Sequence, residues 1–382
     1  MLTAEDAGRI ASEIASVLPA GEKSGLAKIE SALSEFLAQA DNRDALEETK
    51  KNLQFVFSGI AEYLGARSGT RTDYSGTASL APTPWIWKSG SFIPWGEALV
   101  HVLTHSLHYG SAAFEGIRFY ETPRGPAVFR LKEHIDRLYY SGSALRMQIP
   151  WPKEELVEAC LELVRRNGLS EGYLRPLVYY GYGKMGVNPK NVPVDAAIAS
   201  WKWGNYVGAN AADVVVSRFI RIHPKSSVAD AKLAGHYVNS IMGVQDINGT
   251  KYHEAVFLDY KGNVAEGSGE NFFLVKDGVL HTPSLGSILA GITRNTIIEM
   301  AKDLKLEVVE RDITLEEAFS ADEAFFTGTA AEVTPIRSIN DKPLGKTGDV
   351  GPVTEKLRKL YADSVRGKIA QYEKYLSYAV KG

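Results

Sequence analysis

The order of strand-like and helix-like segments is the feature that most restricts what this chain can fold into. From Trp85 onward the two kinds are mixed, without the strict alternation that builds an all-parallel sheet. Asp277-Gly278 between two β-rich segments is a strong hairpin signal. This order predicts an α+β or mixed fold. We expect strands at 85–87, 91–94, 173–182, 196–201, 211–216, 255–259, 271–275 and 279–281, and helices at 132–145, 153–167, 293–304 and 353–374.

Residues 1–66 have a different composition from the rest of the chain. They are rich in Ala, Glu, Leu, Ser and Lys, contain a single proline, Pro19, and carry three apolar stripes at helical spacing. Residues 67–83 are polar, with Gly, Ser, Thr and Pro, which is typical of a linker. We therefore expect a helical N-terminal extension at 1–66 and a linker at 67–83.

Composition and charge exclude several classes of protein. The formal net charge of -3 argues against a general nucleic-acid binder. An acidic N-terminus and the lack of a long apolar run disfavour secretion and membrane insertion, so we expect a cytoplasmic protein. The one cysteine, Cys160, cannot form an intramolecular disulfide, and its helical spacing with Leu156 and Leu163 predicts a buried core thiol. The eight histidines show no metal-binding spacing, so no metal site is expected.

Lys232 is the first candidate for chemistry, because it lies in the small and apolar context Ala231-Lys232-Leu233-Ala234-Gly235. Such surroundings remove hydration from an ammonium group and favour the neutral amine, the nucleophile that an imine-forming lysine needs. A surface lysine at the end of a loop has the same local pattern. Lys232 alone therefore leaves both interpretations open.

Three further motifs have the composition of a ligand site. Glu266 enters a glycine-rich turn at 266–270, where a buried carboxylate would keep a pyridine nitrogen protonated, although a polar hairpin turn looks alike. Gly291-Ile292-Thr293 opens a helix, and 327–332 is a second loop of small residues. Both could bind an anion through backbone N–H groups, or serve only as a cap and a turn. Taken together with Lys232, these motifs are the set that pyridoxal phosphate requires.

In the order and spacing of these motifs, residues 84–382 resemble the fold-type IV pyridoxal-phosphate enzymes, the class IV aminotransferases. The segments His108-Tyr109-Gly110, Phe114-Glu115-Gly116-Ile117-Arg118 and His134-Ile135-Asp136-Arg137-Leu138 carry the same resemblance. It implies a small α/β domain at 84–205 and a larger, barrel-like α/β domain at 206–382 that binds pyridoxal 5'-phosphate. It also implies a homodimer or higher homo-oligomer with a shared active site.

The resemblance implies a role for each cofactor residue. Lys232 matches the Schiff-base lysine, Tyr237 the tyrosine that bonds the phenolic oxygen, and Glu266 the partner of the pyridine nitrogen. The phosphate would be held by the guanidinium of Arg137, a planar fork for phosphate oxygens. The remaining phosphate contacts implied are Ile292, Thr293 and Thr329. His236 is a departure, since the family usually has asparagine there.

Tyr173-Leu174-Arg175-Pro176 and Gly186-Val187-Asn188-Pro189 are similar to the group that acts on branched-chain L-amino acids. The implied reaction is reversible ping-pong transfer of the amino group of L-leucine, L-isoleucine or L-valine to 2-oxoglutarate. Alternatives are a D-amino acid or amine aminotransferase, an aminodeoxychorismate lyase, or a catalytically silent scaffold. The implied substrate contacts are Tyr109, which would reach the neighbouring subunit's site, and Phe114, Tyr173, Arg175, Val187, Trp203, Tyr206, Thr329 and Ala330.

Overall fold

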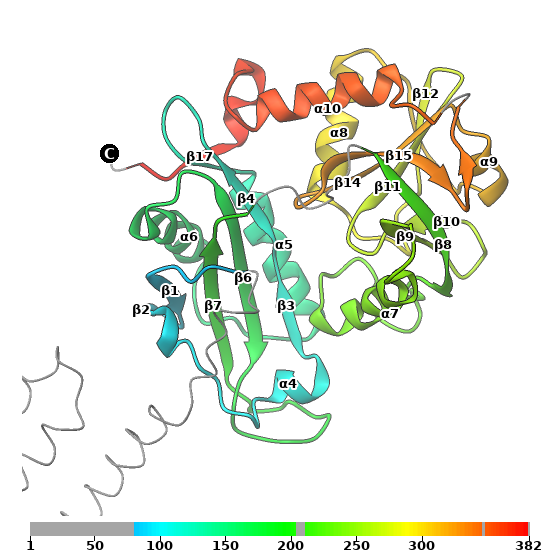
Figure 1. The fold of residues 1–382 in the computed structure, drawn as a ribbon. Helices are drawn as coiled ribbons and strands as arrows, with labels where there is room; N and C mark the ends of the chain where they lie inside the picture. Colours follow the sequence, from blue (N-terminus) through cyan, green and yellow to red (C-terminus); the bar gives the residue numbers. More distant parts are fainter. Residues whose placement is uncertain (1–79, 204–210, 346–347, 381–382) are drawn as a thin grey trace, which may run out of the picture. The chain divides into compact units, whose positions relative to one another are not determined.

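The computed structural model describes residues 80–203, 211–345 and 348–380, and the structural statements below refer to these residues. The contacts of the chain group into two units, 1–79 and 80–382. The helical extension expected at 1–66 therefore lies outside the described residues, as does the expected boundary between 205 and 206. The second unit contains two sheets with helices packed on them (Figure 1).

The first sheet has eight strands and is antiparallel throughout. The strand order is β17-β5-β4-β6-β7-β1-β2, with β3 paired to β6. The strands expected at 85–87 and 91–94 pair as a hairpin, and its turn residues Ser89 and Gly90 have positive φ, 44° and 94°. The strands are β1 (Trp85–Lys88), β2 (Ser91–Pro94), β3 (Ala112–Phe114), β4 (Ile117–Tyr120), β5 (Ala127–Phe129), β6 (Gly172–Tyr180), β7 (Val194–Trp201) and β17 (Leu376–Tyr378).

The partner strand of β6 is interrupted. Strand β3 pairs with one half of β6 and β4 with the other, and Glu115-Gly116 lies between them. Pro176 of β6 lies opposite this gap and accepts a hydrogen bond from Glu115 N at 2.8 Å. The N–H that proline lacks would point to the same side, so β6 loses no ladder bond to β7. Proline is thereby tolerated inside a central strand, and the gap leaves the Glu115 side chain free to turn away from the strand.

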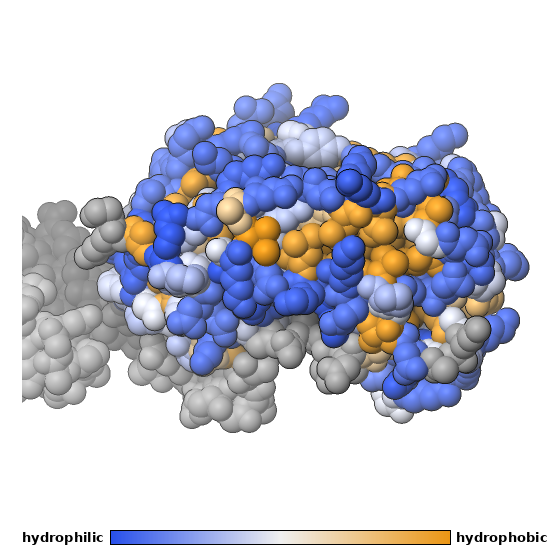
Figure 2. Space-filling model, turned by 90° about the horizontal axis from the view of Figure 1, so that it is seen from above, coloured by the Kyte–Doolittle hydropathy of each residue, from blue (hydrophilic) through white to orange (hydrophobic). Residues whose placement is uncertain are grey.

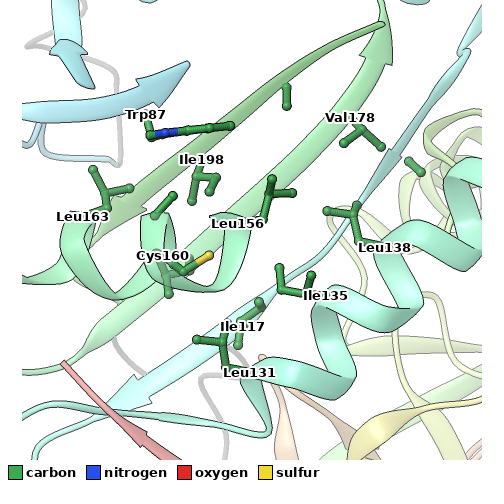
Figure 3. Packing of buried hydrophobic residues seen from close by; sticks show 14 of the residues in the cluster. Trp87, Ile117, Leu131, Ile135, Leu138, Leu156, Cys160, Leu163, Val178 and Ile198 are labelled. Carbon is green, nitrogen blue, oxygen red and sulfur yellow. The ribbon is translucent and has the colours of Figure 1, made fainter. Parts of the chain in front are cut away.

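Helices α5 (Leu131–Ala144) and α6 (Lys153–Asn167) pack on this sheet over a large apolar core (Figure 3). Their apolar positions recur at helical spacing and meet side chains of β6 and β7 such as Val178 and Ile198. Cys160 is fully buried in this core, which confirms its predicted place, and burial raises the pKa of its thiol. Two short helical segments, η2 (Trp95–Glu97) and α4 (His105–Tyr109), precede β3.

The second sheet has nine strands and closes on itself, because β10 pairs with both β9 and β11. The closed ring runs β10-β9-β8-β15-β14-β11, and β8 is parallel to both its neighbours. The barrel-like domain that the resemblance implied is thus present. The strands are β8 (Ala212–Ile220), β9 (Glu254–Leu258), β10 (Val264–Glu266), β11 (Asn271–Lys276), β12 (Val279–Thr282), β13 (Val308–Glu310), β14 (Glu323–Gly328), β15 (Glu332–Ile339) and β16 (Lys342–Pro343).

The remaining helices cover this sheet and join it to the first. They are η3 (Ala234–His236), α7 (Tyr237–Ile247), α8 (Ile292–Asp303), α9 (Leu315–Phe319), α10 (Pro352–Ser364) and η4 (Ala370–Tyr375). A second apolar cluster connects β4 and β5 with α8 and α10, so the two sheets share buried surface. None of the helices in the described part of the chain combines the length and the hydropathy that a membrane span requires.

The single helix predicted at 353–374 is wrong in its second half. Helix α10 ends at Ser364, and Gly367 takes a φ of 70°, in the left-handed region that glycine adopts without strain. The chain then forms η4 and enters the first sheet as β17. This turn places Tyr372 and Leu376 in the cluster between the sheets, so tertiary packing overrides the continuing helical pattern.

We expect residues 80–382 to fold without residues 1–79. Contacts of the described unit begin with Thr83, whose hydroxyl donates to Ser200 O at 3.0 Å, and Trp85, whose N–H donates to Asn167 Oδ1 at 2.8 Å. A chain shortened to 80–382 should give a cooperative melt by circular dichroism, close to that of the full chain. Further removal through Lys88 takes away β1 and the buried Trp87 and should abolish that melt. An insoluble 80–382 fragment would contradict the boundary.

Candidate active site

A solvent-open cavity of about 710 Å³ is lined by residues from both sheets. Most of the predicted site residues line it, although they come from distant parts of the sequence. These are Phe114, Arg137, Tyr173, Arg175, Trp203, Lys232, Tyr237, Ile292, Thr293, Thr329 and Ala330.

Four predicted site residues are not in this lining. Tyr206 lies outside the described residues. Tyr109 and Val187 are 41% and 87% exposed, and the Tyr109 hydroxyl accepts a hydrogen bond from Gly186 N at 2.9 Å, which joins α4 to the loop after β6. Glu266 is buried behind the wall, one contact away from the cavity.

Lys232 lies in the loop between β8 and η3, directly before the helix that carries Tyr237. Its Nζ donates to Tyr237 Oη at 2.6 Å and lies 5.1 Å from the centre of the Phe114 ring. The buried neighbours Ala231 and Leu233 anchor the backbone on both sides. The half-buried amine is thus held at the cavity wall beside a hydroxyl.

The Glu266 carboxylate is held on both oxygens. Oε1 accepts from Arg221 Nε at 2.7 Å, and Oε2 accepts from Asn271 Nδ2 at 3.0 Å and Leu289 N at 3.1 Å. Asn271 and Leu289 themselves line the cavity. These three contacts hold a negative charge directly behind the cavity wall. The carboxylate oxygens can still accept further hydrogen bonds.

The N-terminus of α8 forms one end of the cavity. No side chain caps this helix end, so the N–H groups of its first turn are available to an anion, which the helix dipole also favours. Gly291 is required by close approach, since a Cβ there would come within 1.9 Å of Asn271 Oδ1. Arg137 Nη1 donates to Ala290 O at 3.0 Å, which brings a guanidinium to the same end.

Arg137 is in turn held by Glu115, which is completely buried. Glu115 accepts from Arg137 Nε at 2.7 Å and Nη2 at 2.8 Å, and from His134 Nδ1 at 2.7 Å. Burial alone would raise the pKa of Glu115, but the charge and hydrogen bonds of Arg137 and His134 outweigh burial and hold that pKa well below its usual range. Burial lowers the pKa of His134 although the neighbouring Glu115 favours its charged form, and its Nδ1–H donates to Glu115.

A second buried carboxyl group, Glu270, lies in the cavity wall and accepts a hydrogen bond from Gly269 N at 3.0 Å. Burial, together with the negative charges of Glu254 and Glu266, raises the pKa of Glu270 to about 8. Glu254 is bonded by Ala255 N and Ser268 Oγ, yet burial raises its pKa as well. At neutral pH the wall therefore holds Glu270 as the uncharged acid.

Several contacts in the site were not predicted from the sequence. Glu115 and His134 stand inside recognised motifs, but nothing local indicates that they hold Arg137. Arg221 has no sequence signal, since it is a single arginine in a loop. His236, the departure from the family pattern, lies with its Nε2 2.5 Å from Ser227 Oγ, and burial lowers its pKa.

Comparison with known proteins agrees with this geometry. The family model for amino-transferase class IV matches residues 112–339. A branched-chain-amino-acid aminotransferase of Pseudomonas aeruginosa is 48% identical over 287 residues, covering 74% of this chain and 93% of that protein. The enzyme of the same name from Escherichia coli K12 is 42% identical over 283 residues, covering 72% and 91%.

Solved structures agree as well. The T.th. branched-chain amino acid aminotransferase complexed with N-(5'-phosphopyridoxyl)-L-glutamate superposes with a TM-score of 0.76 at 46% identity. That comparison covers 78% of this chain and 99% of the other. The Escherichia coli enzyme gives a TM-score of 0.74 at 40% identity, covering 78% and 100%.

The fold and the cavity thus define a class IV aminotransferase, and the chain belongs to that family. Within the family it belongs with the branched-chain amino acid aminotransferases, and it is an enzyme, a transaminase.

We expect Glu115→Gln to lower the free energy of unfolding by about 3 kcal/mol, because it removes the fully buried counter-charge of the partly buried Arg137. Urea unfolding at neutral pH measures this. Glu133→Gln is the matched control: Glu133 of α5 also pairs with an arginine, the N-cap residue Arg130, but its side chain is 37% exposed, so its loss should cost less than about 1 kcal/mol. Equal effects of the two substitutions would contradict the importance of the buried pair.

The raised pKa of Glu270 predicts a pH dependence of stability. Between the pKa of an unfolded glutamate, about 4.3, and about 8, the folded chain keeps a proton that the unfolded chain has lost. The free energy of unfolding should therefore fall as pH rises through this window, by at most about 1.4 kcal/mol per pH unit for one group. Glu270→Gln should flatten the fall in urea titrations, and Glu121→Gln, at an exposed position, should not. Parallel curves for wild type and Glu270→Gln would reject the assignment.

Proposed function

We propose that this chain transfers the amino group of L-leucine, L-isoleucine or L-valine to 2-oxoglutarate, with pyridoxal 5'-phosphate as its cofactor. The observation that carries the proposal is the pairing, across one cavity, of the Lys232 amine with the anion-binding end formed by α8 and Arg137. An amine and an anion site in one cavity suit a cofactor with an aldehyde and a phosphate.

The residues present fit that cofactor. Phosphate would lie at the uncapped N-terminus of α8, bonded by Ile292 N–H, Thr293 and Thr329, with Arg137 as counter-charge. The ring has room at Gly269, where a Cβ would meet no other atom within 4 Å. Tyr237 Oη would bond the phenolic oxygen, and Glu266 would face the ring nitrogen. One relative, the T.th. enzyme, was solved both with pyridoxamine 5'-phosphate and with a phosphopyridoxyl adduct of glutamate, which supports this choice.

When bound, pyridoxal phosphate supplies the carbonyl that captures an amino group and the ring that accepts electrons. Lys232 is the base that takes the proton from the substrate Cα and later returns a proton. Tyr237 Oη, 2.6 Å from Nζ, orients that amine. Glu266, held by Arg221, keeps a negative charge beside the ring. These are the tasks of transamination that the side chains themselves perform.

The aromatic part of the cavity wall supports the proposed substrates. Phe114, Tyr173 and Trp203 offer aromatic faces to an aliphatic side chain, and Tyr173 and Trp203 stack at 4.8 Å. The backbone N–H groups of Thr329 and Ala330 would bind the substrate α-carboxylate. Arg175 would receive the second carboxylate when glutamate or 2-oxoglutarate occupies the same space.

A homodimer with a shared site is part of the proposal. Tyr109 and Val187 are exposed in one chain and absent from its own cavity lining. Further exposed apolar side chains stand close to them in the sequence: Leu103 and Leu107 near Tyr109, and Met185 near Val187. A hydrogen bond between Gly186 N and the Tyr109 hydroxyl joins the two segments. An apolar surface of this kind is typical of an interface, and a second copy would bring Tyr109 to the neighbouring cavity, as the resemblance implies.

An amino-donor panel tests the function. The purified enzyme should convert L-leucine, L-isoleucine and L-valine with 2-oxoglutarate, and not D-leucine, as measured by glutamate formation. Lys232→Ala is the matched negative control: it should lose nearly all turnover, because no other amine lines the cavity among the described residues. A preference for D-amino acids or for amines would reject the substrate assignment. Normal turnover by Lys232→Ala would reject the role of the lysine.

A further inference from the structure

One face of α5 contacts the proposed cofactor site at two places, the start of α8 and the backbone of Lys232. From its N-cap onward, residues 130, 134, 137 and 141 follow the spacing of neighbours on one face of a helix. Arg130 Nη1 donates to Thr296 Oγ1 of α8 at 2.9 Å, and Arg137 reaches the backbone just before α8. Ser141 is one turn further on. The same helix therefore contacts the anion-binding end and, through Ser141, the lysine end.

The contact at the lysine end is made to the backbone. Ser141 is completely buried, and its Oγ accepts a hydrogen bond from Lys232 N at 2.9 Å. On the other side, Lys232 O accepts from Phe114 N at 3.2 Å, and Ala113 forms an isolated bridge with Leu233. The Lys232 backbone is thus held from two directions, by α5 and by the end of β3.

We propose that Ser141 is a positioning residue for Lys232: its hydroxyl fixes the point from which the lysine side chain enters the cavity, at a set distance along α5 from Arg137. The inference rests on the proposed function of Lys232. The partly buried Lys232 N–H must find another partner if it loses this acceptor, and a movement of the loop would provide one. Because Nζ must meet the substrate Cα proton at hydrogen-bond distance, a small movement of the Lys232 backbone costs rate.

A role confined to packing predicts something different. Removal of one buried oxygen would then lower thermal stability, with turnover of the folded enzyme unchanged. Positioning predicts slower proton transfer in an enzyme that still folds and still binds substrate. The two are separated by comparing kcat with KM and by following the Lys232 amide directly.

The test compares Ser141→Ala with Ser143→Ala in the full-length holoenzyme. Ser143 is on the same helix but exposed, and its hydroxyl donates only to Tyr140 O. Ser141→Ala should lower kcat for L-leucine about tenfold or more with little change in KM. It should also speed amide hydrogen exchange in the peptide that contains Lys232. Ser143→Ala should change neither.

Ser141→Cys is the conservative variant, since it fills nearly the same space with a weaker acceptor, and its kcat should lie between those of wild type and Ser141→Ala. It also serves as the readout if Ser141→Ala does not fold. Unchanged kcat and unchanged exchange at Lys232 in Ser141→Ala, or a Cys variant equal to wild type when the Ala variant is unfolded, would overturn the proposal. Failure of the proposed function is distinct: turnover would then survive Lys232→Ala.

Discussion

Glu115 carries a negative charge in a place without water, and both of its partners lie on α5. The gap between β3 and β4 turns this side chain inward, and Pro176 makes the gap compatible with a continuous β6. Because the charge of a buried carboxylate must be compensated, Arg137 and His134 can lie in only one arrangement relative to the sheet. This fixes the rotation of α5 about its own axis.

With that rotation fixed, the contacts of α5 with the second sheet follow. Arg137 and Ser141 are one helical turn apart, about 6 Å along the axis, and they reach the backbone before α8 and the backbone of Lys232. The separation of the two ends of the cavity is therefore set by a rigid helix that belongs to the other sheet. A cofactor that must contact both ends binds to a site already formed, with little reorganisation.

Figure 2 shows that apolar surface gathers in the middle of one face of the molecule, bordered by hydrophilic residues.

The elements that the sequence predicts well are those with a local cause. The hairpins at Ser89-Gly90 and Asp277-Gly278 follow from turn residues, and α5, α6 and α8 from long amphipathic patterns. Strands of three residues such as β3 and β10 have too few positions to show a period. The same distinction between local and long-range causes applies to the residues of the site. Lys232, Glu266 and Arg137 are read from motifs, whereas Glu115 meets His134 across 19 positions and Ser141 meets Lys232 across 91, contacts that only the packed fold creates.

Arg175 explains how one wall can serve two kinds of side chain in the proposed reaction. Its Nε is buried and makes no hydrogen bond within the described residues, and its guanidinium lies 4.8 Å from the centre of the Phe114 ring and 5.6 Å from that of Tyr173. Aromatic faces stabilise a cation without neutralising its hydrogen-bonding capacity. When an aliphatic side chain fills the space, the rings of Phe114 and Tyr173 would stabilise the positive charge of Arg175, whose Nε has no hydrogen-bond partner. In the proposed reaction a second carboxylate would pair with the guanidinium of Arg175, so that one residue would accommodate both substrates.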